Sequence, residues 1–182
     1  MATRRFDPDR RDRIIVAALD VIAANGVAGA SHRKIADHAG VPLGSMTYHF
    51  TSMDELLANA FRRFADSVAE QFEHRLRAAA TAEEARAAVV DLVHVDLLDS
   101  HRDLVLTHEL YTLAAREPVF REITRDWMGR SRHALEIHFD PVTSRMLDML
   151  IEGAFIHAAL DTEPHERATT AEAVARIAGP AL

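Results

Sequence analysis

Signals for the start of a helix recur along this chain and divide it into segments of helical length. A capping residue, or an acidic residue followed by proline, suits the free N–H groups of a first helical turn. Two sites, Ser52 to Glu55 and Thr81 to Glu84, have the Ser/Thr-x-x-Glu spacing of a capping box. The other predicted starts are Asp7-Pro8, Ser31, Val41-Pro42, Ser100, Glu117-Pro118, Asp140-Pro141 and Thr162-Glu163-Pro164.

Apolar residues between these starts repeat with the period of an α-helix. In the segment after Ser52, Leu57, Phe61, Phe64 and Val68 keep to i+3/i+4 spacing. Alternating patterns typical of strands are not evident. The chain is therefore predicted to be all-α, with about nine helices and boundaries uncertain by a few residues.

Two segments, 88–98 and 146–160, are apolar around most of their circumference. Such a helix must be covered on both sides, and a partner subunit is the natural cover for the second segment. The sequence thus predicts a two-fold four-helix interface between 146–160 and the last helix. The residues expected in it are Leu147, Leu150, Ile151, Ala154, Phe155, Ala158, Val174 and Ala178.

Composition excludes several classes of protein. The absence of cysteine removes disulfides, cysteine zinc sites and thiol nucleophiles. The first residues are charged rather than apolar, and no apolar run reaches the ~18 residues of a membrane span. We expect a cytoplasmic protein with no membrane partner and no cofactor.

The formal net charge of −7 is unevenly distributed. Residues 1–64 hold nine basic against seven acidic residues, whereas residues 65–182 hold twelve against twenty-one. The acidic excess therefore belongs to the C-terminal part, and the N-terminal part remains able to approach a polyanion.

Residues 31–57 contain two short predicted helices that meet at Gly40, where a left-handed backbone suits glycine. Ile35, Met46 and Phe50 are placed to pack inward. On a helical wheel, Gly44 and Tyr48 lie opposite Met46, and Ser45 and Thr47 flank them. Such a small, hydroxylated and aromatic face can enter a DNA major groove.

The run from Ile35 to Leu56, Ile-Ala-x-x-Ala-Gly-Val-Pro-x-Gly-x-x-x-Tyr-His-Phe-x-Ser-x-x-x-Leu, resembles the helix-turn-helix of the TetR family of repressors. The close resemblance covers residues 9–60. It implies a DNA-binding domain over 1–52 and a helical ligand-sensing and dimerisation domain over 53–182. It also implies a dimeric repressor that a small molecule releases from a near-palindromic operator in double-stranded DNA.

Residue by residue, the resemblance carries DNA contacts onto several positions. Pro42, Leu43, Gly44, Thr47 and Tyr48 match base and backbone contacts, and Ser45 shares their helix. The expected phosphate contacts are His32, Arg33 and His49, with Arg4 and Arg5 in the N-terminal arm.

Two positions depart from the family's pattern. Met53 stands where the family often has a lysine, and Pro42 stands where it often has a serine. Arginines of the N-terminal arm are expected to compensate for the missing lysine.

Several polar or aromatic residues interrupt the apolar stripes of the C-terminal part. A few polar groups in apolar walls are typical of a small-molecule pocket, although an ordinary core with satisfied histidines has the same pattern. The residues expected to converge on one ligand cavity are His94, His108, Tyr111, Trp127 and His157.

The alternative is a helical metal-dependent enzyme or metal sensor that uses the C-terminal histidines. His108-Glu109 begins like a zinc-protease helix, but Thr112 stands where the second histidine belongs. Asp91 with His94, and His157 with Asp161, have spacings that suit metal ligands, but such pairs of two residues are frequent in a histidine-rich helical chain. No catalytic residues and no metal are therefore assigned, and the chain is not expected to be an enzyme.

Overall fold

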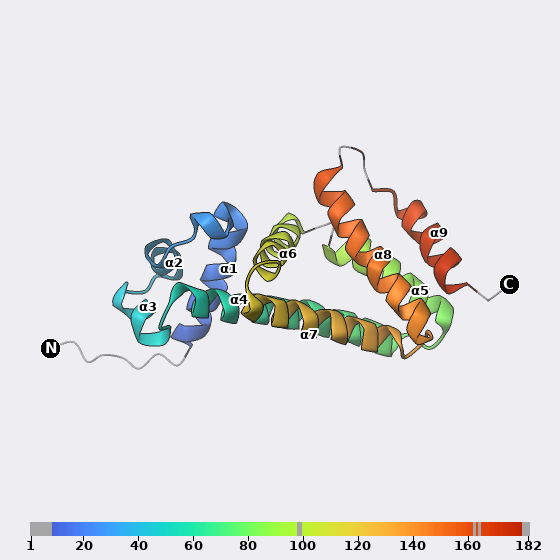
Figure 1. Ribbon diagram of the computed structural model, residues 1–182, viewed down its shortest axis with the longest axis horizontal. Helices are drawn as coiled ribbons and strands as arrows, with labels where there is room; N and C mark the ends of the chain where they lie inside the picture. The colour runs from blue at the N-terminus through green and yellow to red at the C-terminus, as the bar shows by residue number, and fades with distance from the viewer. Residues whose placement is uncertain (1–8, 98–99, 162, 164, 180–182) are drawn as a thin grey trace.

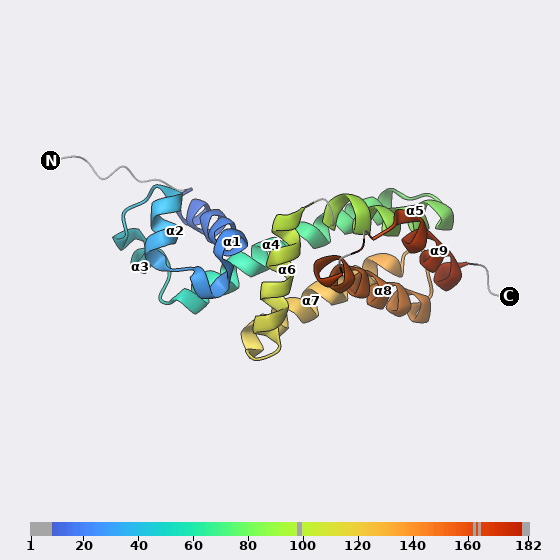
Figure 2. The same cartoon turned by 90° about the horizontal axis from the view of Figure 1, so that it is seen from above.

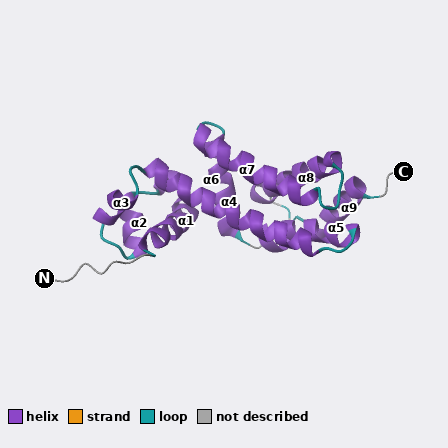
Figure 3. Ribbon diagram, turned by 90° about the horizontal axis from the view of Figure 1, so that it is seen from below, coloured by secondary structure: helices purple, strands orange, loops and turns teal. Residues whose placement is uncertain are grey.

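The computed structural model describes residues 9–97, 100–161, 163 and 165–179. Within these ranges the chain is all-α with no strand, which confirms the predicted fold class (Figures 1 and 3). Its helices are α1 (Arg10–Gly29), α2 (His32–Ala39), α3 (Gly44–His49), α4 (Met53–Ala78), α5 (Ala82–Asp91), the π-helix η1 (Leu92–Leu97), α6 (His101–Ala114), α7 (Pro118–Leu135), α8 (Pro141–Leu160) and α9 (Arg167–Ala178).

Helices α1, α2 and α3 form a compact unit at one end of an elongated molecule (Figure 1). The predicted stop at Asn25-Gly26 is a break rather than an end. Gly26 has φ +68°, and the helix then resumes as far as Gly29. The predicted start at Asp7-Pro8 lies outside the described residues, and α1 begins at Arg10.

The predicted caps at Ser52, Thr81 and Ser100 are confirmed, since each side chain accepts an N–H of its own first turn. Pro118 and Pro141 open α7 and α8 as expected. The last helix starts later than predicted, at Arg167. Of the predicted start, Thr162 and Pro164 lie outside the described residues.

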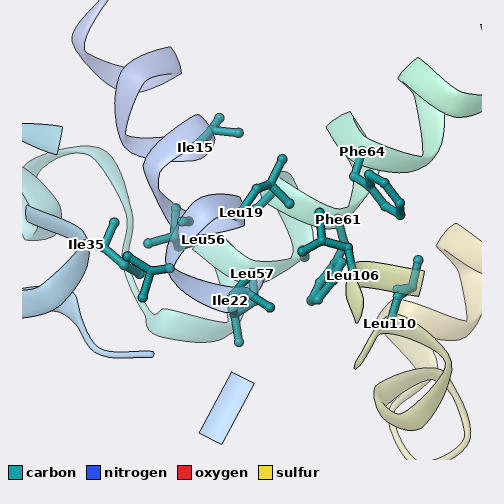
Figure 4. Packing of buried hydrophobic residues seen from close by; sticks show 14 of the residues in the cluster. Ile15, Leu19, Ile22, Ile35, Leu56, Leu57, Phe61, Phe64, Leu106 and Leu110 are labelled. Atoms are coloured by element: carbon teal, nitrogen blue, oxygen red, sulfur yellow. The ribbon is translucent and has the colours of Figure 1, made fainter. Parts of the chain in front are cut away.

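The long helix α4 connects the N-terminal unit to the rest of the molecule, and α7 runs beside it (Figures 1 and 2). Its apolar side chains enter two clusters. The first, with Phe61 and Phe64, joins α4 to α1, α2, α6 and α7 (Figure 4). The second, with Phe72 and Leu76, joins α4 to α5, η1, α8 and α9. Helix α4 thus ties both ends of the molecule together.

No helix in the described ranges is both long and apolar enough to cross a membrane.

Candidate DNA-reading surface and sensor core

The turn between α2 and α3 is built as the sequence predicts. Ser31 caps α2 by accepting from the N–H of Lys34, and Gly40 ends it with φ +63°. The N–H of Val41 then donates to the carbonyl of Ala36 at 3.0 Å. These contacts fix the angle at which α3 leaves α2.

Helix α3 has a buried face and an exposed face. Met46, together with Phe50 at the helix end and Ile35 of α2, is fully buried. On the other face Tyr48 is 79% exposed and Leu43 is 54% exposed. Pro42, Gly44 and Thr47 are exposed beside them. This arrangement leaves a small helical surface free to meet a groove.

The other residues expected to contact DNA differ in how exposed their side chains are. Ser45 is buried, at 8% exposure, on the same side of α3 as Met46, so it is not free to meet DNA. Arg33 is exposed, and His32 and His49 are half-buried. Arg4 and Arg5 lie outside the described residues.

Contacts to α1 and α4 hold the end of α3 in place. The Arg11 guanidinium lies over the Phe50 ring at 5.1 Å and donates to Asn59 Oδ1 at 2.9 Å. At the start of α4, Glu55 Oε2 accepts from the hydroxyl and N–H of Thr51, which lowers the pKa of the Glu55 carboxyl. The reading surface is therefore braced from both sides.

A second group of polar and aromatic side chains lies where α6, α7 and α8 meet. The Tyr111 hydroxyl donates to Glu152 Oε2 at 2.6 Å, and the rings of Tyr111 and Trp127 are 6.1 Å apart. Trp127 also packs edge-on against Phe64 of α4, at 5.8 Å. A cavity of about 20 Å³ adjoins this group, lined by Val68, Phe72, Leu92, Trp127, Ser131, Asp148, Ile151, Glu152 and Phe155.

The five residues expected to share one cavity do not all meet there. Tyr111 and Trp127 come together, but His94 lies 2.8 Å from Thr170 Oγ1 and stacks on His165. His108 is hydrogen-bonded to the Leu104 carbonyl of its own helix, and its Nε2 is buried without a partner. His157 is exposed.

Sequence reasoning missed Asp148 and Glu152, the two carboxylates beside this cavity. Their signal was present, because each interrupts the otherwise apolar segment 146–160. Asp148 is buried and accepts from Arg132 Nη1 of α7 at 2.9 Å. A charge inside an apolar helix is a stronger indication of a site than a histidine on its edge.

Six of the eight residues expected between subunits are buried within their own chain: Leu147, Ile151, Ala154, Phe155, Val174 and Ala178. The all-round apolar pattern did not show which of these side chains pack inside their own chain. Leu150 and Ala158 are half-buried. The exposed apolar stripe of α8 consists of Val142, Met146, Met149, Ile156 and Leu160.

An ion pair links α6 to the N-terminal unit formed by α1, α2 and α3. Arg102 of α6 pairs with Asp20 of α1 at 2.9 Å, and Asp20 lies 3.4 Å from His38 of α2. About two turns further along α6, the backbone of α1 comes so close to Glu109 that a Cβ on Gly26 would sit 2.7 Å from Glu109 Oε1. Helix α6 is thus tied directly to α1.

The metal alternative gains no support from the geometry. Among the residues that the structure describes, no group of three or more His, Asp or Glu side chains is placed to hold a metal ion.

A helix-turn-helix with an exposed third helix, carried on a larger helical domain, defines a class of DNA-binding transcription regulator. The model of "Bacterial regulatory proteins, tetR family" matches residues 14–60. A transcriptional regulator of Streptomyces coelicolor A3(2), SCO7518, has a solved structure with 60% identity and a TM-score of 0.87, covering 94% of this chain and 99% of that one. The chain belongs to the TetR family.

Two further relatives bear on function. The multidrug binding protein EbrR, solved in complex with ethidium, is 31% identical with a TM-score of 0.78, covering 92% of this chain and 98% of that one. The fatty acid metabolism regulator protein of Bacillus subtilis (strain 168) is 33% identical over 98 residues, which are 54% of this chain. The chain spans only half of that curated relative, 50% of its length.

Proposed function

We propose that this chain is a cytoplasmic, dimeric repressor that leaves a near-palindromic operator when a small molecule binds its helical core. Residues 1–52 read the DNA, and residues 53–182 sense the ligand and hold the dimer. The exposed face of α3 carries this proposal. Tyr48, Thr47 and Leu43 stand free over a fully buried Met46, so they can meet bases and phosphates without unfolding the domain.

The dimer is proposed to form on the exposed stripe of α8 rather than on its buried face. Val142, Met146, Met149, Ile156 and Leu160 follow 4-3-7-4 spacing, which keeps them on one side of the helix. An exposed apolar surface of this length on a soluble chain favours association, and a two-fold axis makes the stripe pack on its own copy. Such an axis spaces two reading helices about 34 Å apart, one turn of B-DNA.

The ligand is proposed to bind beside Tyr111 and Trp127. EbrR has been solved with imidazole, ethidium, proflavin and malachite green, and HdnoR of Paenarthrobacter nicotinovorans is a nicotine-responsive repressor. These relatives support a small-molecule effector in this chain too. The contact of α6 with α1 through Arg102 and Asp20 gives the ligand a route to the reading helices.

In vitro selection from random duplex DNA tests this function without knowledge of the target genes. We expect the full chain to enrich a sequence with two inverted half-sites about one helical turn apart. It should then bind this sequence far more tightly than scrambled duplex at physiological salt. Enrichment of no sequence, or of a single half-site without symmetry, would contradict the proposal.

A further inference from the structure

The core around Trp127 contains two carboxylates, of which only one has a counter-ion. Asp148 is paired with Arg132 at 2.9 Å. Glu152, one helical turn further along α8, accepts only the Tyr111 hydroxyl. In the described part of the chain, no arginine, lysine or histidine lies within ion-pair distance of Glu152. Among the described residues, the core therefore contains one carboxylate that has no counter-ion.

Burial raises the pKa of Glu152 to about 7, and the neighbouring charge of Asp148 acts in the same direction against the Tyr111 hydrogen bond. Burial also raises the pKa of Asp148, although Arg132 and Arg145 oppose this. The side chains of α4 and η1 at the cavity are apolar. At neutral pH the unmatched carboxyl thus lies close to the balance between its two forms, and a positive ligand would favour the ionised one.

The walls of the cavity suit a cation as well. Phe72, Trp127 and Phe155 line it, and the face of an aromatic ring attracts a positive charge. The cavity of about 20 Å³ has room for roughly one water molecule, so a ligand must displace side chains to enter. Beside the cavity, the hydrogen bond from Tyr111 to Glu152 joins α6 to α8.

We propose that this core takes an organic cation, a quaternary or protonated amine on a compact aromatic body, with Glu152 as its counter-ion and Trp127 as its wall. This inference rests on the proposed function, because it names the class of effector for the same sensor core. The cavity holds roughly one water molecule, so an ammonium group that reaches Glu152 must displace the Tyr111 side chain of α6 away from α8. Helix α6 then loses its tie to α8 while it keeps its ion pair to α1, so its movement reaches the reading unit.

Three probes with the same benzyl body and tetrahedral head test the charge: benzyltrimethylammonium, the uncharged neopentylbenzene and the anion phenylmethanesulfonate. Trp127 is the single tryptophan of the chain, so its fluorescence reports binding at the site. We expect the cation to bind about tenfold or more tightly than the uncharged probe, and the anion to bind more weakly than either.

Glu152→Gln keeps the size of the side chain and removes its charge. We expect this variant to lose the preference for the cation, whereas the matched control Glu122→Gln, on the exposed side of α7, retains it. The affinity of the parent for the permanently charged probe should rise with pH up to about 7 and then level off, and Glu152→Gln should abolish this rise.

Equal binding of the cation and the uncharged probe, no binding of any of the three, or full cation preference in Glu152→Gln would each overturn the inference. Binding to the selected operator is measured separately on the same preparations. If the chain binds its operator but shows no charge preference, the proposed function stands and only the cationic ligand is contradicted. If the chain prefers the cation but selects no operator, the proposed function is contradicted instead.

Discussion

Two guanidinium nitrogens of Arg102 reach one carboxylate oxygen of Asp20, at 3.1 Å from Nε and 2.9 Å from Nη2. This contact joins α6, the helix that carries Tyr111, to α1, the first helix of the N-terminal unit. Both side chains are partly exposed, so the pair adds little to stability. Its position between the two functional regions makes it a candidate for transmission rather than for folding.

We therefore expect Arg102→Gln to leave both the operator affinity and the benzyltrimethylammonium affinity close to those of the parent. The factor by which this cation weakens operator binding should fall by roughly fivefold or more, the lower end of typical allosteric coupling. Fluorescence anisotropy of labelled operator with and without the cation measures this factor. Arg125→Gln, which removes an exposed ion pair to Asp126, is the matched control and should leave it unchanged.

The reading surface gives a second prediction. Thr47→Ala combined with Tyr48→Ala should weaken specific binding by several kcal/mol, at roughly 1–3 kcal/mol for each lost contact. The melting temperature should stay near that of the parent, because both side chains are exposed. Operator retardation by the double variant that equals that of the parent would show that α3 does not read the DNA.

The shared core of the two regions gives a third prediction. Phe61 of α4 is fully buried and meets Phe120 of α7 edge-on at 6.0 Å. Phe61→Ala should lower the free energy of unfolding by about 3–5 kcal/mol, since it removes a large apolar side chain and leaves a cavity. Urea denaturation measures the loss. A change as small as that expected for an exposed residue would mean that the cavity is filled by rearrangement.

The dimer gives a fourth prediction. Met149 is 59% exposed in the single chain, so Met149→Glu should leave the subunit folded and yield monomers, because it puts a charge into the proposed interface. Ile137→Glu, at another exposed apolar residue just after α7, should stay dimeric. Light scattering separates the two. A dimeric Met149→Glu variant at micromolar concentration would rule out the α8 stripe.

Local signals made most of the fold predictable. A cap such as Ser52 acts within one helical turn, and the left-handed turn at Gly40 depends only on the backbone of that residue. Both features can therefore be predicted from the local sequence. The buried face of α8 could not be predicted from the sequence. Phe155 and Met149 are both apolar, and only the packing of α5 and α9 decides that one is buried and the other exposed.

The sensor core was predicted in part for a similar reason. Tyr111 and Trp127 belong to α6 and α7, and their meeting depends on how these helices cross. His94 contacts Thr170 and His165 instead, two residues far along the chain that no helical periodicity connects to it. Partners from distant elements decide the role of a polar residue in an apolar stripe.

The last prediction concerns pH and the same Glu152. Its pKa rises on folding, from an ordinary value of 4.5 to about 7, because burial disfavours the charged form. Between these two values the folded chain binds more protons than the unfolded chain, so stability is greatest below pH 4.5 for this group and declines as pH rises toward 7. The full decline is on the order of 3 kcal/mol, at about 1.4 kcal/mol for each unit of the shift. Other groups titrate in this range, so urea denaturation of the parent is compared with that of Glu152→Gln at each pH. The stability of the parent relative to Glu152→Gln should fall by this amount from pH 4.5 to 7, and a difference that stays constant would show that folding leaves the pKa of Glu152 unchanged.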